Sequence, residues 1–149
     1  IEDFPQARVH VMEREREAAE HKRRGFAGGG EPWFGFDSVR QLDGLPPEIL
    51  MVPLPGHTWG HAGVAIQTGD GWVLNAGDAY FYRGEMNPQH YSCTPGLRFY
   101  QRLMEVDRSA RLANQDRLRQ LNREHGKDIT IFCSHDEKEL EAMQRRSNL

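Results

Sequence analysis

The chain has 149 residues, 38% of them hydrophobic, with a formal net charge of -3 and a sequence pI near 6.2. This length and composition predict a single domain with a modest core and exclude a disordered chain. The weakly acidic balance gives no electrostatic support for binding nucleic acid or an anionic membrane. Because the sequence shows no signal peptide and no long apolar run, we expect a soluble, cytoplasmic protein without a membrane span.

The first third of the chain is predicted to hold one strand, one helix and a long loop. The strand covers residues 7–12, and the helix covers residues 13–24 and ends at Gly25. Residues 25–47 are rich in glycine, proline and aromatic side chains, which indicates an ordered loop.

Three strands are predicted in the middle of the chain. Their sequences are EILMVPL, HAGVAIQT and GWVLNAGD, at residues 48–54, 61–68 and 71–78. The sequence GDG between the second and third segments is typical of a hairpin turn. We therefore expect three strands in a row, with a glycine-rich loop between the first two.

A long helical segment follows these strands. Thr94 is the predicted N-cap, Pro95 the first helical residue, and Gly126 the end of the segment. The segment is either one helix or two helices with a break near residues 107–113.

The C-terminal region is predicted to contain a buried strand and a last helix. Residues 128–136 form the β-rich run, and Asp136 and Glu139 form a capping box at the start of the helix. The two cysteines, Cys93 and Cys133, match no metal-binding or disulfide pattern, so we expect free thiols.

The sequence LPGHTWGHAG, residues 54–63, contains two histidines four residues apart. On a helix, His57 and His61 would share one face and could bind a metal ion together. Three glycines and two nearby prolines disfavour a helix, because each internal glycine costs about 1 kcal/mol relative to alanine. The segment is therefore predicted to be a loop, whose histidines are either metal ligands or ordinary loop residues.

His57, Asp78 and His135 each stand just past the C-terminal end of an apolar run. In layered α/β folds this edge gathers ligand-binding and catalytic groups, because the strands end rigidly there and loops begin. Two imidazoles and one carboxylate suit a divalent transition metal such as zinc, iron or manganese. Each residue alone would be an ordinary turn or cap residue, but together they favour a metal site.

Three motifs occur in an order that matches a known family. PGHTWGH, LNAGD and FCSHD closely resemble the second half of the metallo-β-lactamase fold, the αββα hydrolase superfamily that includes glyoxalase II and lactonases. The resemblance runs through nearly the whole chain. It implies an α/β fold, with a mixed β-sheet and flanking helices, in which residues 1–149 form a single domain that is the C-terminal half of the αββα sandwich.

The resemblance also implies roles for individual residues. His57 is similar to a histidine of the first metal site, Asp78 to the carboxylate that bridges two metals, and His135 to a histidine of the second site. Thr58 and His61 resemble supporting residues, with His61 hydrogen-bonded inside the fold rather than bound to metal.

In the complete fold, two metal ions roughly 3.5 to 4 Å apart would lower the pKa of a shared water and polarise the substrate. Tyr80 and Tyr82 lie just beyond Asp78, where the resemblance implies that a tyrosine could donate a hydrogen bond to the developing oxyanion. Tyr80 is therefore a candidate catalytic residue together with Asp78. Simple packing of both aromatic rings at the strand end is the competing interpretation.

One feature of the family is missing from this sequence. The HxHxDH signature, which supplies most of the remaining metal ligands in the first half of the fold, does not occur. The chain is therefore either a fragment of a longer protein or a half encoded alone, and we expect it to bind at most one zinc, manganese or iron ion, weakly. Two functions stay open: half of a metal-dependent hydrolase of small-molecule esters, lactones or thioesters, and a catalytically incomplete half-fold that acts as a binding or assembly module.

The missing half also predicts an uncovered sheet. In the full sandwich two sheets pack face to face, so the inner face of this chain would lack its partner. That face should include Val64, Ile66, Trp72 and Leu74, or their neighbours one position along. Soluble monomers rarely expose apolar patches on the order of several hundred Å², so we expect either the N-terminal half or a second copy of the chain, in a homodimer, to cover it.

Overall fold

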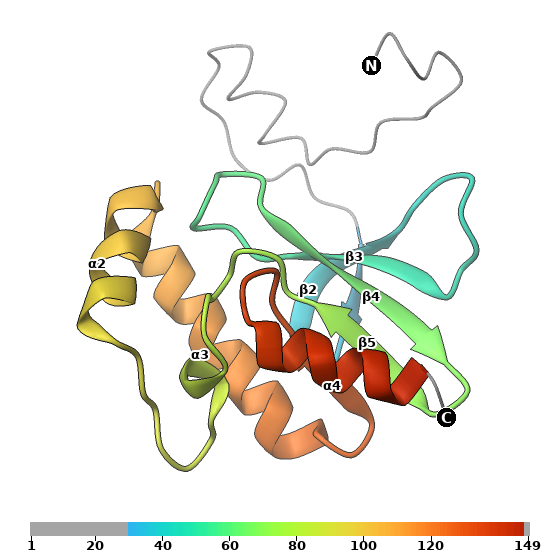
Figure 1. Cartoon of the computed structure of the whole chain (residues 1–149). Coiled ribbons are helices and arrows are strands. Elements are labelled where there is room, and N and C mark those ends of the chain that lie inside the picture. Colours follow the sequence, from blue (N-terminus) through green and yellow to red (C-terminus); the bar gives the residue numbers. More distant parts are fainter. Residues whose placement is uncertain (1–29, 148–149) are drawn as a thin grey trace, which may run out of the picture.

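The computed structural model describes residues 30–147, and the strand and helix predicted over residues 7–24 lie outside this range. The described residues form six strands, three α-helices and one short 3-10 helix (Figure 1). In chain order they are β1 (Glu31–Trp33), β2 (Phe36–Gln41), β3 (Ile49–Pro53), β4 (Ala62–Thr68), β5 (Gly71–Asn75), η1 (Arg83–Met86), α2 (Pro95–Met104), α3 (Arg108–His125), β6 (Ile129–Phe132) and α4 (Glu137–Ser147). None of these helices has the length and hydrophobicity that a membrane span requires.

The six strands form one sheet in which neighbours in the chain are also neighbours in space (Figure 1). Strands β1 to β5 pair antiparallel, and β6 pairs parallel with β5. The register places Ala65 of β4 between Leu50 of β3 and Leu74 of β5. The predicted mixed sheet is confirmed, and the three predicted middle strands are observed as β3, β4 and β5.

The region predicted as a loop, residues 25–47, holds the hairpin of β1 and β2. Its turn lies at Phe34 and Gly35, which have positive φ angles of 43° and 81°. Trp33 packs edge-to-face against Trp72, with ring centroids 5.3 Å apart, and this contact anchors the hairpin to the sheet. The loop prediction was wrong because these short strands contain proline and charged residues instead of a clear apolar alternation.

The long helical segment is two helices, which is the second of the two predicted alternatives. Thr94 caps α2 by accepting a hydrogen bond from the backbone N–H of Leu97 at 3.3 Å, with Pro95 in the first turn. Asp107 caps α3 by accepting from the backbone N–H of Ala110 at 3.0 Å. Short polar side chains satisfy the free N–H groups of a first helical turn, so both helices begin at a residue suited to it.

Helix α3 packs against one face of the sheet and forms the core with it. Val52, Ala65 and Leu74 of the strands are fully buried in one cluster with Leu118 and Leu121 of α3. The two α3 residues are three positions apart and therefore lie on the same side of the helix. Burial of this apolar surface, at about 25 cal/mol per Å², is the main stabilisation of the fold.

Alternate residues of β4 lie on the other face of the sheet and are exposed. Val64 and Ile66 are 36% and 43% exposed, as the predicted uncovered face requires. For β5 the second alternative of the prediction holds, that is, the neighbours one position along, because Leu74 pairs with Ala65 and shares its covered face. Residues two positions apart in a strand point to the same face, so Trp72 lies on the covered face together with Leu74.

Truncation of one residue on each face should distinguish the two faces. Leu74→Ala removes fully buried methyl groups and should lower the free energy of unfolding by about 2–5 kcal/mol. Ile66→Ala, on the exposed face, should cost less than about 1.5 kcal/mol. Urea unfolding followed by circular dichroism, at a concentration where the chain is monomeric, measures both. Equal losses in the two variants would contradict this assignment of the faces.

Candidate metal centre

Asp78 lies between two imidazoles. Its Oδ2 is 3.4 Å from Nε2 of His57, and its Oδ1 is 2.9 Å from Nε2 of His135. These three side chains, called here the Asp78 cluster, come from the loops that follow β3, β5 and β6. Their exposed fractions are 17% for His57, 33% for Asp78 and 49% for His135, so solvent reaches the cluster mainly from the His135 side.

The loop that carries His57 is fixed by its backbone. The carbonyl of Gly56 accepts a hydrogen bond from the N–H of Val106, just before α3, at 2.9 Å. The N–H of Gly56 donates to the carbonyl of Thr58 at 2.9 Å, which closes a tight turn around His57. Gly56 has a φ of +140°, a conformation that favours glycine. Thr58 therefore supports the loop through its backbone.

His61 holds this loop against the Asp78 loop through both ring nitrogens. Nδ1 is 2.8 Å from the carbonyl oxygen of Leu54, and Nε2 is 2.9 Å from the backbone nitrogen of Asp78. Because a carbonyl accepts and a backbone N–H donates, the ring carries its hydrogen on Nδ1 and accepts at Nε2. Both nitrogens are thus engaged, which makes His61 a bracing residue. Gly77 allows the ring to approach, since a Cβ there would lie 2.8 Å from Nε2.

The loops after β5 and β6 continue the pairing of their strands. The N–H of Ala76 donates to the carbonyl of Phe132 at 2.8 Å, and the N–H of Ser134 donates to the carbonyl of Gly77 at 3.1 Å. Both backbones are therefore held in register beyond the last strand residues. This register carries the carboxylate and the second imidazole of the Asp78 cluster to the same place.

Tyr80, a candidate oxyanion donor on sequence grounds, has a different position. It is fully buried, and its hydroxyl donates to both carboxylate oxygens of Glu139 at 3.0 and 2.9 Å. Glu139 also accepts from the N–H of Cys133 at 2.8 Å. Burial, and then the adjacent carboxylate, raises the pKa of the Tyr80 hydroxyl well above its ordinary value. Burial likewise raises the pKa of the Cys133 thiol to about 12. Of the two interpretations of Tyr80, this geometry favours packing, because a buried and already paired hydroxyl links the loop after β5 to α4.

Asp136 makes a second link between the same two regions. Its carboxylate accepts from the backbone N–H of Arg83 at 2.7 Å, from the Arg83 guanidinium at 3.0 Å and from the N–H of Lys138 at 2.9 Å. Burial alone would raise the pKa of Asp136, but these hydrogen bonds outweigh it and lower the pKa. The predicted capping box is confirmed for Asp136, which caps α4. It is wrong for Glu139, whose carboxylate instead accepts a hydrogen bond from the Tyr80 hydroxyl.

Phe81 is a neighbour of the cluster that the sequence reasoning missed. Its ring centroid lies 4.5 Å from that of His135 and 6.0 Å from that of His57. Phe81 is 6% exposed, so it forms a fixed apolar wall beside both imidazoles. Its place three residues after Asp78 was a signal in the sequence, but a phenylalanine there is equally typical of plain packing.

A buried polar network supports the Phe81 backbone and was also missed. Glu85, 1% exposed, accepts from the N–H of Phe81 at 3.1 Å and from the side-chain amide of Gln101 at 2.9 Å. The guanidinium of Arg111 donates to the amide oxygen of Gln101 at 2.8 Å. The network joins η1, α2 and α3 to the loop after β5. No local sequence pattern marks such a network, because its members lie far apart in the chain.

The donor types of the Asp78 cluster fit a metal ion, whereas their spacing is not that of a finished site. Two imidazoles and one carboxylate suit a divalent transition metal, which zinc exemplifies with bonds of about 2.0–2.2 Å. Within residues 30–147, no group of three or more His, Cys, Asp or Glu side chains is arranged to hold such an ion. Asp78 instead contacts the two imidazoles directly. A metal ion here therefore needs a rearrangement or further ligands.

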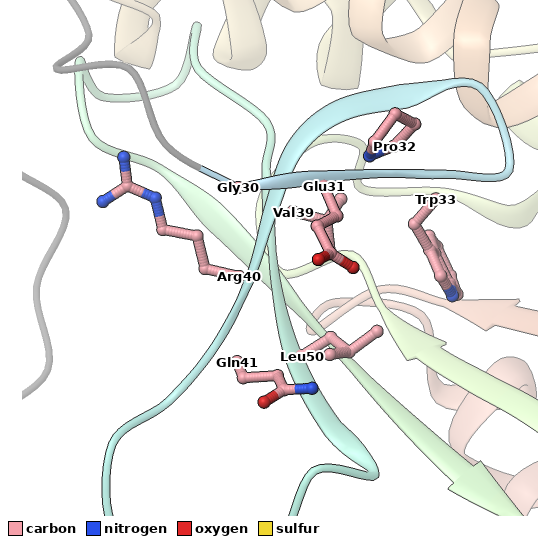
Figure 2. Close-up of a pocket in the computed structure, with 8 residues that line it drawn as sticks. All are labelled: Gly30, Glu31, Pro32, Trp33, Val39, Arg40, Gln41 and Leu50. Atoms are coloured by element: carbon pink, nitrogen blue, oxygen red, sulfur yellow. The ribbon is translucent and has the colours of Figure 1, made fainter.

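A separate cavity of about 530 Å³ lies along β1, β2 and β3 (Figure 2). Figure 2 shows Glu31, Trp33 and Leu50 near one another in this region, while Arg40 points away from them. The cavity shares no described residue with the Asp78 cluster, and its described lining holds no histidine or cysteine. It therefore offers no imidazole or thiolate ligand.

Comparison with known proteins finds relatives that are similar to most of the chain. No family model matches it. Two curated proteins, from Mycobacterium bovis and Mycobacterium tuberculosis, are each named "probable metallo-hydrolase". Each is 36% identical to the chain over an alignment that is 155 residues long. The alignment covers 91% of this chain and 50% of each relative. The chain thus spans about half the length of the curated relatives that it matches.

Solved structures show the same fold. An N-acyl homoserine lactone hydrolase, with the product N-hexanoyl-L-homoserine bound at its catalytic metal center, matches with a TM-score of 0.56 and 19% identity, over 89% of this chain and 48% of that one. A quorum-quenching N-acyl homoserine lactone lactonase matches with the same TM-score and identity over 50% of its chain. At this identity the likeness concerns the fold alone. By sequence and fold together, the chain belongs to the metallo-β-lactamase fold superfamily, and it makes up about half of that fold.

Proposed function

We propose that the chain is half of a metal-dependent hydrolase, in which an activated water attacks an ester, lactone, thioester or related bond. One observation carries the proposal: Asp78 contacts both His57 and His135, although the three residues follow three different strands. The identity of 36% to metallo-hydrolases over 91% of the chain supports it.

The residues that would hold the metal ion are His57, Asp78 and His135. When bound, zinc, manganese or iron supplies a Lewis acid that makes water nucleophilic near neutral pH and polarises the substrate carbonyl. The chain's own groups orient the site, since His61 fixes the backbone of Asp78 at 2.9 Å. Phe81 shields one side of the two imidazoles from water, which strengthens electrostatic interactions there.

The proposed substrate is a small molecule with a hydrolysable acyl bond. Two solved proteins of the same fold are named for N-acyl homoserine lactones, which makes esters and lactones the first class to test. Because the chain covers about half of these proteins, we propose that the activity belongs to the complete fold. The remaining metal ligands would then come from the half that this sequence does not contain.

The second candidate function is a binding or assembly module with an incomplete site. The lack of a ready three-ligand group within residues 30–147 favours it for the chain taken alone. Metal stoichiometry and hydrolysis of simple substrates separate the two functions.

We expect the purified chain to bind at most one zinc ion, because the two-metal arrangement needs more donors than the cluster supplies. His57→Ala and His135→Ala should each weaken zinc binding by at least about tenfold. His90→Ala is the matched control, since His90 is exposed on a loop and lies outside the cluster. Isothermal titration calorimetry measures stoichiometry and affinity. Two tightly bound ions per chain, or equal losses in all three variants, would contradict the ligand assignment.

We also expect the isolated chain to hydrolyse generic esters and lactones barely above background. The reason is the same shortage of ligands, which leaves the activating metal weakly held. Release of p-nitrophenol from p-nitrophenyl butyrate, with saturating zinc, is the measurement. Robust turnover that is lost in His57→Ala would show that this chain is catalytically complete.

The exposed face of the sheet is the proposed contact with a partner, either the missing half or a second copy of the chain in a homodimer. Val64 and Ile66 of β4 pair with Met51 and Ile49 of β3, so four apolar side chains lie together on this face. An apolar patch of this kind is typical of an interface. Two identical faces related by a two-fold axis would cover each other.

Ile66→Glu should weaken self-association by at least about tenfold, because an unpaired charge is costly in an apolar interface. Leu112→Glu is the control, since Leu112 is 38% exposed on α3, away from this face. Sedimentation velocity at micromolar concentration gives the oligomeric state of each variant. A wild-type chain that stays monomeric throughout would refute the homodimer.

A further inference from the structure

A second cavity of about 530 Å³ opens beside the Asp78 cluster. It lies between the loop after β5, the start of α2 and the start of α4, and its lining includes Phe81, Leu97, Tyr100 and His135. His135 lines the cavity and also contacts Asp78 at 2.9 Å. The cavity therefore adjoins the proposed metal site directly.

Apolar side chains form two of its walls. The ring centroid of Phe81 is 4.5 Å from that of His135 and 5.9 Å from that of Tyr100, so Phe81 is shared by the cluster and the cavity. Leu97 and Tyr100 are three residues apart on α2 and lie on the same side of the helix. Leu97 is half-buried and Tyr100 is 49% exposed. A ligand that covers them removes apolar surface from water.

The charged groups around the cavity are largely paired with one another. Arg83 donates to Asp136 at 3.0 Å, and Lys138 donates to Glu141 at 3.0 Å. Glu137 is exposed at the start of α4. Both cations that line the cavity are therefore paired with carboxylates, whose negative charges oppose the approach of an anionic ligand group. An uncharged, apolar group meets no such repulsion.

Helix α2, which forms one wall of the cavity, is fixed by the buried hydrogen bonds of Gln101. Gln101, 3% exposed, donates to the carboxylate of Glu85 at 2.9 and 3.0 Å and accepts from Arg111 at 2.8 Å. These buried hydrogen bonds fix the helix that carries Leu97 and Tyr100. A wall that is already ordered lowers the entropic cost of binding.

We propose that this cavity binds the apolar, non-reacting part of the substrate, an alkyl chain or hydrocarbon ring attached to the bond that is hydrolysed at the Asp78 cluster. The inference rests on the proposed hydrolase function and adds to it a site for the substrate's apolar group. The volume of about 530 Å³ falls within the range of about 300–1,000 Å³ that is usual for small-molecule sites. Leu97 and Tyr100 then determine which apolar groups are accepted.

The test uses 1-butanol, 1-pentanol and 1-hexanol as uncharged probes, titrated into the 15N-labelled chain and followed by NMR. Each added methylene should tighten binding about fourfold, which corresponds to about 0.8 kcal/mol per buried methylene. Amide shifts should concentrate at Phe81, Tyr100 and His135. If the affinity did not increase from 1-butanol to 1-hexanol, the proposal would be overturned.

Variants of α2 locate the binding surface. Tyr100→Ala should weaken 1-hexanol binding at least about fivefold, and Tyr100→Phe should retain it because the ring remains. Phe99→Ala is the matched control, since Phe99 is 70% exposed and does not line the cavity. Equal losses in Tyr100→Ala and Phe99→Ala would show non-specific binding to α2 and refute the cavity.

Zinc titration of the same samples separates this proposal from the function on which it rests. Tyr100→Ala should bind zinc as the wild type does, because Tyr100 contributes no ligand. Zinc binding without chain-length-dependent alcohol binding would overturn the cavity proposal alone. Chain-length-dependent alcohol binding without zinc binding would overturn the hydrolase function, and with it the substrate role of the cavity.

Discussion

Both ring nitrogens of His61 are committed to backbone groups, and the geometry of the site depends on this constraint. One nitrogen holds the carbonyl of Leu54 just after β3, and the other holds the N–H of Asp78 just after β5. Two loops that leave separate strands are thus joined by one rigid ring. Because His57 lies on the first of these loops, its approach to Asp78 at 3.4 Å follows from the same link.

Two carboxylates, one buried and one partly buried, also fix the loop after β5. Glu139 joins Tyr80 to the start of α4, and Glu85 holds the backbone of Phe81. Such groups add little net stability, because desolvation offsets much of their hydrogen bonding, but an unpaired member would be costly. They therefore specify where this loop lies more than they stabilise the fold. One loop thus positions the carboxylate of the cluster and the apolar wall of the adjoining cavity.

Features that rest on interactions between residues close in the sequence could be predicted, whereas features that rest on long-range packing could not. Strands β3 to β5 and the start of α2 rest on apolar runs and short-range capping, and they were predicted, whereas a separate α3 was one of two alternatives. The β1–β2 hairpin was missed because its anchor is the long-range packing of Trp33 on Trp72. Three motifs predict the Asp78 cluster, and the structure brings its side chains together. The burial of Tyr80 and the wall formed by Phe81 arise from packing against α2 and α4, which no local pattern encodes.

The central claim is that the Asp78 cluster supplies two imidazoles and one carboxylate to a metal ion. X-ray absorption spectroscopy of the zinc-loaded chain tests this claim most directly, because it reports the atoms bound to the metal. The account predicts scattering from two imidazole rings, with nitrogen and oxygen ligands at about 2.0–2.2 Å and no sulfur. Sulfur at about 2.3 Å, or a spectrum without imidazole scattering, would contradict it.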